Sequence, residues 1–173
     1  MRTLLRHGLA VLLFASTAAY AQVDERAMKA AYLYNFIQFA QWPVPPDEPF
    51  RLCVLGRTPM DEPLARLEGK RVLNDVHIKV VHVSLQDPLA PCHALYLDDS
   101  QRKLAPELLA RLDSAPILTI TDGDGLADQG LMIEIQKRDL KLGFEVNLAM
   151  ARKVRISFNA RMLKMANYVA GAK

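Results

Sequence analysis

The alternation of apolar and polar residues is clearest over residues 116–148, and the rest of the chain is organised around this stretch. Residues 117–120 form an apolar run typical of a strand covered on both faces. The Asp-Gly-Asp-Gly sequence at 122–125 predicts a turn, because glycine accepts positive φ and aspartate side chains bond nearby backbone groups. In residues 131–136 and 140–147, every second residue is then apolar. They predict a hairpin with one apolar face and one charged face.

Shorter apolar segments upstream alternate between strand and helix patterns. Strands are expected over 50–55, 76–83 and 94–97, and helices over 60–67 and 104–112. Strands that alternate with helices favour a mostly parallel sheet. We therefore expect an α/β fold, a three-layer α/β/α sandwich whose mostly parallel sheet ends in a C-terminal antiparallel hairpin.

The first helix is expected to begin at Asp24, a favourable capping residue, and to stop at Trp42 because prolines follow. One face of this helix is largely apolar and is expected to pack on the sheet. That face comprises Ala27, Ala30, Ala31, Tyr34, Ile37 and Gln38, widened by Leu33, Phe36 and Ala40.

The C-terminal residues 148–169 predict two helical pieces, with a break near Ser157 or Asn159. Their outward side is basic. A solvated basic face is the ordinary interpretation, and a docking surface for an acidic partner is the alternative. The basic residues are Arg152, Lys153, Arg155, Arg161 and Lys164.

The first 21 residues have the pattern of an export signal. A basic start is followed by a short apolar run, and Ala19-Tyr20-Ala21 matches an A-x-A cleavage site. Cleavage is expected after Ala21, leaving residues 22–173 as one domain. The formal charge then falls from +3 to +1, because two arginines and no acidic residue are removed. Such a balance does not favour nucleic acid as a partner.

Two cysteines, Cys53 and Cys92, remain in the expected exported chain. Disulfides persist outside the cytoplasm, so a single bridge is expected there, and two separate buried thiols are the alternative. A bridge closing this loop would stabilise the fold by about 3 to 4 kcal/mol on the chain-entropy model.

Residues that could carry chemistry are few. His77 and His82 have opposite parity on one expected strand, so they do not form a metal pair, and no nucleophile elbow is present. The run from Asp122 begins like an EF-hand loop, but Leu126 and Ile133 stand where oxygen ligands are required. We expect no catalytic, cofactor or metal residues. A small exported ligand-binding protein or enzyme that uses the Asp122–Asp128 loop is the alternative.

Five separated blocks carry a resemblance to a known family. They are KAAYLYNFIQFAQWP, CVLG, PCHALYL, PILTITDGDGLADQGLMIEI and LGFEVNLAMARKVRIS. In this order after an export signal, they resemble the YfiR family of small periplasmic bacterial proteins. The resemblance implies a non-enzymatic repressor that binds the periplasmic region of an inner-membrane diguanylate cyclase. It further implies low cyclic di-GMP, reduced biofilm formation, and sequestration by an OmpA-like outer-membrane lipoprotein. Homodimer formation stays open.

The resemblance also implies roles for particular residues. It makes Cys53 and Cys92 a family cysteine pair, whereas a second pair found in some relatives is replaced here by Ala127 and Glu134. The Lys153-Val154-Arg155 segment stands where relatives commonly have a small or glycine-containing turn. We expect the partner-binding residues on the exposed side of the late hairpin and the adjoining helix. On that exposed side they are Glu134, Glu145, Asn147, Arg152 and Arg155. Phe144 is also expected to take part in partner binding, because the resemblance implies that Phe144, Glu145 and Asn147 form the family's late-strand signature.

Overall fold

The computed structural model describes residues 15–73, 75–139 and 141–171. Most of the expected export signal, residues 1–14, lies outside the described residues. Within them, no helix is both long and apolar enough to span a membrane.

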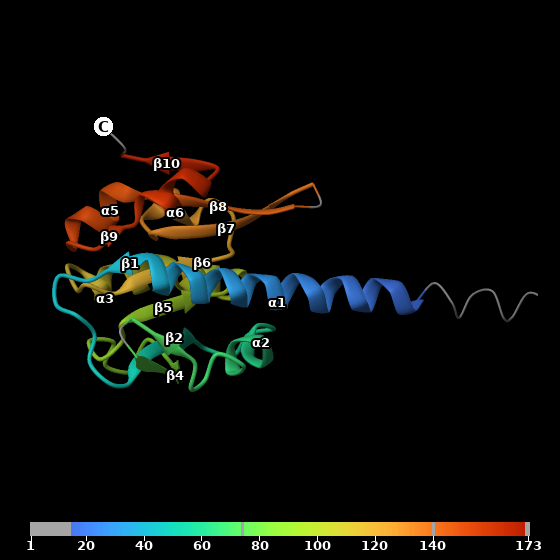
Figure 1. The fold of residues 1–173 in the computed structure, drawn as a ribbon, viewed down its shortest axis with the longest axis horizontal. Coiled ribbons are helices and arrows are strands. Elements are labelled where there is room, and N and C mark those ends of the chain that lie inside the picture. The colour runs from blue at the N-terminus through green and yellow to red at the C-terminus, as the bar shows by residue number, and fades with distance from the viewer. Residues whose placement is uncertain (1–14, 74, 140, 172–173) are drawn as a thin grey trace, which may run out of the picture.

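One twisted sheet of eight strands forms the centre of the structure (Figure 1). Its strand order is β10-β8-β7-β6-β5-β2-β4-β3, so β6 lies inside the sheet as the sequence predicts. Neighbouring strands are parallel except in the β7–β8 hairpin and the β3–β4 pair. The strands are β2 (Phe50–Leu55), β3 (Arg71–Val72), β4 (Val76–Val83), β5 (Ala94–Leu97), β6 (Leu118–Thr121), β7 (Ile133–Arg138), β8 (Lys141–Asn147) and β10 (Tyr168–Ala170). Two more, β1 (Ala40–Gln41) and β9 (Ser157–Phe158), form a separate antiparallel pair.

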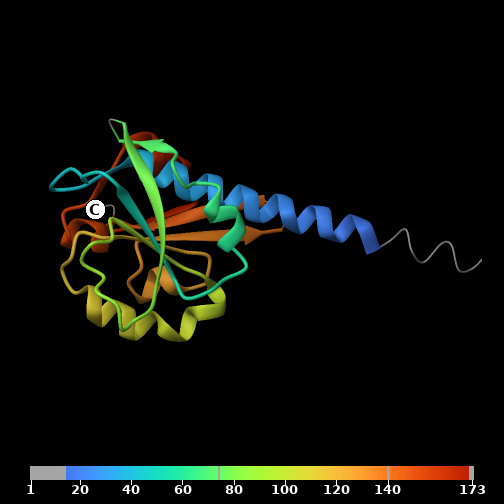
Figure 2. The same cartoon turned by 90° about the horizontal axis from the view of Figure 1, so that it is seen from below.

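Helices cover both faces of the sheet, with α1 and α3 on opposite sides in the view from below (Figure 2). The α/β sandwich with a C-terminal antiparallel hairpin is therefore confirmed. The helices are α1 (Ala15–Phe39), α2 (Asp61–Ala65), the 3-10 helix η1 (Asp99–Leu104), α3 (Ala105–Leu112), α4 (Leu126–Gln129), α5 (Leu148–Lys153) and α6 (Ala160–Met165).

Each face of the sheet has its own apolar core. On the α1 face, Phe36 packs edge-on against Phe144 of β8 with ring centroids 4.8 Å apart, and both side chains are buried. On the α3 face, Leu108 packs among residues of β2 and β5. The disulfide between Cys53 and Cys92 lies in this second core and spans 39 positions of the chain. The expected cysteine pair is thus confirmed.

The first helix differs from its prediction in two ways. Its described part begins at Ala15, so Asp24 lies inside the helix and is not its cap. Its buried face is also rotated, because the sheet takes the large side chains Leu33, Phe36 and Ile37, whereas the smaller or polar positions on the neighbouring face are exposed. The exposed members of the predicted face are Ala27, Ala31 and Gln38.

The end of the chain contains a strand that was expected to be helical. After α6, Asn167 donates its backbone N–H to the carbonyl of Phe144, and Tyr168–Ala170 then pairs in parallel with Glu145–Asn147 of β8. Hydrogen bonding to an otherwise open sheet edge thus outweighs a weak local helix preference.

Candidate functional site

The carboxyl ends of the parallel strands bring several acidic side chains together. Leu97 of β5 and Thr121 of β6 are paired, so the residues that follow them, Asp98 and Asp122, emerge at the same edge of the sheet. In open α/β sheets this edge is where ligands usually bind. It is therefore the first place to look for a functional site.

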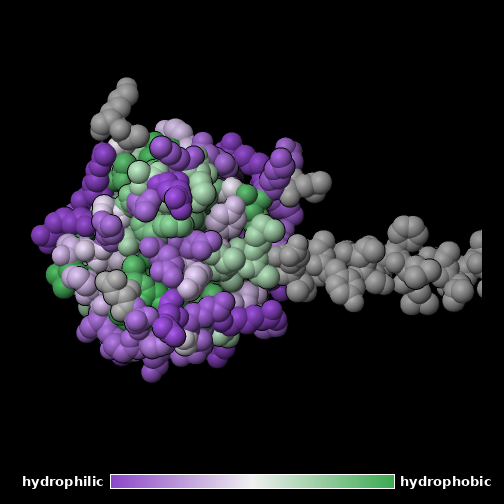
Figure 3. Space-filling model, viewed as in Figure 1, coloured by the Kyte–Doolittle hydropathy of each residue, from purple (hydrophilic) through white to green (hydrophobic). Residues whose placement is uncertain are grey.

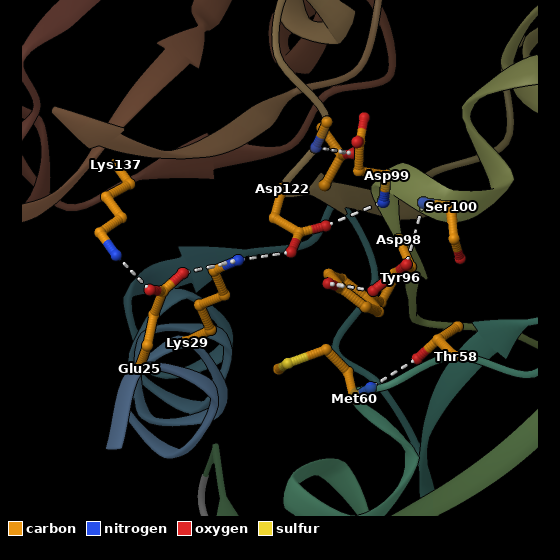
Figure 4. A network of polar contacts seen from close by, with 12 residues as sticks. Glu25, Lys29, Thr58, Met60, Tyr96, Asp98, Asp99, Ser100, Asp122 and Lys137 are labelled. Atoms are coloured by element: carbon orange, nitrogen blue, oxygen red, sulfur yellow. Dashed lines mark hydrogen bonds and ion pairs between the residues drawn. The ribbon is translucent and has the colours of Figure 1, made fainter. Parts of the chain in front are cut away.

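Asp122 is engaged by a lysine from α1 (Figure 4). Lys29 Nζ lies 2.8 Å from Asp122 Oδ2, and the two side chains are only 17% and 8% exposed. Lys29 Nζ also lies 3.4 Å from Glu25, whose carboxylate accepts a 2.6 Å bond from Lys137 of β7. These four residues, Glu25, Lys29, Asp122 and Lys137, form a charge cluster that ties α1 to two strands.

The pKa values in this charge cluster follow from its geometry. Burial lowers the pKa of Lys29, but the hydrogen bond and charge of Asp122 more than offset this, so the pKa is raised overall. The hydrogen bond from Lys137 is the main cause of a lowered pKa for Glu25. Both shifts favour the charged forms, as expected when the partners stabilise one another.

A second set of polar contacts adjoins the charge cluster. The fully buried Tyr96 donates its hydroxyl to Asp98 at 3.3 Å, and Asp98 accepts from the backbone of Ser100 at the start of η1. Asp122 Oδ1 accepts from the backbone N–H of Asp99 at 3.0 Å. Burial, followed by the charges of Asp122 and Asp98, raises the pKa of Tyr96, so its hydroxyl stays protonated.

The turn after β6 is held in place by Glu134 of β7. The Glu134 carboxylate accepts backbone N–H bonds from Gly125 at 3.0 Å and from Ala127 at 2.9 Å, and a bond from Gln136. Glu134 is 1% exposed, so its predicted place on the exposed side of the hairpin is wrong. The turn and α4 fold back over this face of β7, which the alternation along a single strand cannot reveal.

Binding chemistry at this edge is limited by these internal bonds. Two backbone N–H groups of the Asp122–Asp128 loop are already bonded to Glu134. The carboxylate of Asp122 is paired with Lys29. Among the described residues, no group of three or more His, Cys, Asp or Glu side chains is arranged to hold a metal ion. Nor does any buried side-chain nitrogen or oxygen there lack a hydrogen-bond partner. These bonds tie the loop to β7 and α1, while the carboxylates of Asp124 and Asp128 are exposed.

The histidines are dispersed and have structural contacts. His77 and His82 lie at different points of β4, where His77 approaches Glu48 and His82 approaches the carbonyl of Gly56. His93 Nδ1 accepts from the backbone N–H of Arg51 at 2.9 Å, and burial lowers the pKa of His93.

The other predicted partner-binding residues are placed differently from one another. Phe144 is 2% exposed and fills the core beneath α1, so it lies on the apolar face of the hairpin and its side chain does not reach a partner directly. Glu145 is paired with Arg138 at 2.7 Å, and Asn147 caps α5 while also bonding Ala127. Both are half-buried.

Arg152 and Arg155 are exposed, as expected. Arg152 donates to the carbonyl of Gly171 at 2.7 Å, and Arg155 has φ +61°, a conformation that favours glycine. This turn is the one in which relatives were expected to carry glycine.

A second candidate surface lies over α6 and β10. Met165 and Tyr168 are among the most exposed large apolar residues, at 55% and 57%. Arg161 and Lys164 of α6 are exposed beside them. Figure 3 shows hydrophilic and apolar residues side by side over this part of the molecule. We call Arg161, Lys164, Met165 and Tyr168 the C-terminal surface. The helical pattern expected over residues 148–169 gave no sign that Met165 and Tyr168 would be exposed beside an edge strand.

The structure therefore defines an α/β protein whose central polar groups bond to one another and whose last helix and strand carry exposed apolar and basic side chains. A family model described as YfiR/HmsC-like matches residues 26–167. The chain belongs to the YfiR/HmsC-like family.

Comparison with curated proteins gives no match. Among solved structures, the chain is similar to one titled as the crystal structure of an ABC domain in complex with L-Trp from Streptococcus pneumonia. The similarity covers 69% of this chain at 10% identity with a TM-score of 0.49, and the chain spans about half, 54%, of the length of that structure.

Proposed function

We propose that this protein is a periplasmic regulator that binds the sensor region of an inner-membrane diguanylate cyclase and holds it inactive. The outcome is less cyclic di-GMP and less biofilm formation. The family match over residues 26–167 carries this proposal. An OmpA-like outer-membrane lipoprotein would relieve the repression by sequestering the regulator.

Regulation by binding alone fits the chemistry of the chain. The charged groups at the carboxyl edge of the sheet are engaged with one another, and Glu134 occupies the donors of the acidic loop. A repressor without chemistry acts by binding the inactive state of its partner more tightly than the active state, and this difference in affinity sets the extent of repression.

The periplasm is the compartment that suits these features. The first 21 residues have the pattern of an export signal, and the Cys53–Cys92 disulfide suits an oxidising compartment. Cleavage after Ala21 would leave Asp24 and Glu25 in the first turn of a shortened α1, where negative charge is favourable.

Across the late hairpin, α5 and the turn after it, the accessible part of the expected contact surface comprises Glu145, Asn147, Arg152 and Arg155. Glu134 and Phe144 support that surface from inside, Glu134 by holding the turn before α4 and Phe144 by filling the core beneath β8.

The proposal is tested by binding and by second-messenger levels. Purified residues 22–173 should bind the purified periplasmic region of the cyclase in calorimetry, and deletion of the gene should raise cellular cyclic di-GMP. Arg155→Glu should restore high cyclic di-GMP, whereas Lys79→Glu, an equal charge change on exposed β4, should not. Turnover of a substrate by the purified protein, or an unchanged cyclic di-GMP level on deletion, would refute the proposal.

A further inference from the structure

The C-terminal surface combines apolar side chains with positive charge. Met165 ends α6 and Tyr168 begins β10, so the two exposed side chains are three positions apart. Arg161 and Lys164 are exposed on α6. An exposed aromatic and a methionine beside basic residues are a typical composition for a protein-binding surface.

The basic side chains of this region have no ion-pair partner among the residues that the structure describes. No aspartate or glutamate follows Glu145 in the sequence, whereas Arg152, Lys153, Arg155, Arg161 and Lys164 do. None of these five forms an ion pair with another of the described residues. The charge is therefore available to an acidic partner.

The backbone of β10 adds a third element. β10 is the last strand of the sheet, and no described strand pairs with its outer side (Figure 1). The backbone N–H of Asn147 donates to the carbonyl of Met132, which lies on the β7 side of β8. Backbone groups of successive strand residues point to opposite sides, so the N–H and C=O groups of Phe144 and Val146 point toward β10. In the parallel register, Tyr168 and Ala170 face β8, and the N–H and C=O of Val169 point to the open edge.

This edge is held in a fixed position. Arg152 bonds the carbonyl of Gly171 at 2.7 Å, and a Cβ at Gly171 would meet the backbone of Ala149 at 3.0 Å. A Cβ at Gly143 would likewise overlap the side chain of Asn167. These close contacts at the two ends of β10 fix its backbone before a partner arrives. Little conformational entropy is then lost when a partner pairs with the open edge.

We propose that the C-terminal surface binds an extended segment of another protein in which acidic residues alternate with apolar ones. The segment lies along β10, pairs with the backbone of Val169, covers Met165 and Tyr168, and sets its carboxylates against Arg161 and Lys164. Because β10 has three residues, its main chain sets the register and the side chains provide most of the contact. A second copy would bring a like-charged edge, so the occupant is a different, acidic chain.

The inference deepens the proposed function, since the first probe is the periplasmic region of the cyclase. Arg161→Glu with Lys164→Glu should weaken its binding to residues 22–173 by at least tenfold. Lys79→Glu with Lys103→Glu gives the same change in net charge on exposed positions elsewhere and should alter affinity less than twofold.

Two single proline substitutions test whether the open edge of β10 binds the partner. Val169→Pro removes an outward N–H and should weaken binding at least fivefold. Its melting temperature should be no lower than that of Val169→Ala, which also loses packing of Val169 on the core. Ala170→Pro removes an N–H that faces β8 and should instead lower the melting temperature. If both charge reversal and Val169→Pro leave the affinity within twofold of wild type, the inference is wrong and the proposed function stands.

A second probe separates failure of the inference from failure of the proposed function. If the unaltered chain does not bind the cyclase region, the proposed function is wrong, and a blocked nine-residue peptide of alternating Glu and Val decides the inference. It should shift the NMR amide signals of Val169 and α6, whereas the Lys and Val counterpart should not. Absence of these shifts, equal shifts with both peptides, or dimerisation through β10 in their place would overturn the inference.

Discussion

The charge cluster at the carboxyl edge of the sheet and the C-terminal surface use charge in opposite ways. In the cluster, Lys29 and Asp122 are mostly buried and form an ion pair 2.8 Å long. On the C-terminal surface, Arg161 and Lys164 are exposed and form no ion pair with described residues. Buried charge must be neutralised within the fold, while exposed charge costs little to leave for a partner. Substitutions should therefore affect stability in the first region and binding in the second.

The largest stability effect is expected for Asp122→Ala. This change leaves Lys29 without its closest partner and removes the acceptor for the Asp99 N–H. The free energy of unfolding should fall by about 3 kcal/mol, measured by urea denaturation. Asp124→Ala, at the exposed neighbouring aspartate, should change it by less than about 0.5 kcal/mol. Equal effects of the two changes would show that the charge cluster does not stabilise the fold.

A somewhat smaller loss is expected for Glu134→Gln. The amide retains one oxygen acceptor, whereas the carboxylate accepts from both Gly125 and Ala127. A loss of about 2 kcal/mol should appear in urea unfolding, together with faster amide exchange in the turn. Glu145→Gln on the adjacent strand is the control and should cost less than about 1 kcal/mol. Similar losses for both would contradict the bracing role of Glu134.

The pH dependence of the cluster tests its charges directly. The bond from Lys137 lowers the pKa of Glu25 below 4.5, so its contribution is present above the unfolded-state pKa and lost as pH falls through the folded-state pKa. Glu25→Gln should cost about 1 kcal/mol at pH 7. Its difference from wild type should shrink as the pH falls below 4.5 and vanish once the folded-state carboxylate is protonated. A difference that persists after Glu25 has been protonated in the folded state would assign the effect to packing.

At alkaline pH, the contribution of Lys29 to stability should fall as the pH rises, the opposite of the trend for Glu25. The net pKa of Lys29 is raised, so its contribution is complete below the unfolded-state pKa and is lost as pH rises through the folded-state pKa, above 10.5. The difference between wild type and Lys29→Met in urea unfolding should therefore shrink only above that pH. An earlier loss would identify a different titrating group.

A small gain is expected in the C-terminal region from Arg155→Gly. Arginine at φ +61° is strained, and glycine relieves the strain while increasing the entropy of the unfolded chain. The free energy of unfolding should rise by about 0.5 kcal/mol. Lys153→Gly, two positions earlier and within α5, should instead lower it by about 1 kcal/mol. A loss at both positions would show that the conformation of Arg155 is not strained.

The smallest effect on stability is expected for Arg161→Glu with Lys164→Glu. Both side chains are exposed and unpaired among the described residues, so unfolding should change by less than about 0.5 kcal/mol even though binding is expected to weaken. A large loss of stability would mean that these residues hold α6 in place, which would remove the contrast between the two regions.

The sequence predicts what depends on local pattern and misses what depends on distant contact. The inner strand β6 and the hairpin β7–β8 follow from continuous and alternating apolar runs, and both are present. Glu134 alternates with apolar neighbours and therefore looks exposed, but a turn closed by Gly125 and Ala127 covers it. The sequence did contain one signal for this contact: an acidic side chain shortly after a glycine-rich turn can accept the N–H groups of that turn.

The same limit applies to the two candidate sites. Lys29 has no unusual neighbour in sequence, and its partner Asp122 was expected only as a turn residue. Tyr168 and Met165 follow a helical pattern until Asn167 reaches β8, after which the chain becomes an edge strand. Sequence periodicity reports which residues are apolar, whereas the exposure of Tyr168 depends on where the sheet ends.

The pairing of α1 with much later strands has a consequence for biosynthesis. Lys29 pairs with Asp122, which lies 93 positions further along the chain, and Phe36 packs against Phe144 of β8. Neither side chain is covered until these later residues have been made. Because α1 is synthesised before these strands, its aromatic side chains are exposed while the rest of the polypeptide is still being made. The apolar face of this first helix therefore stays uncovered until β8 has been made and has paired.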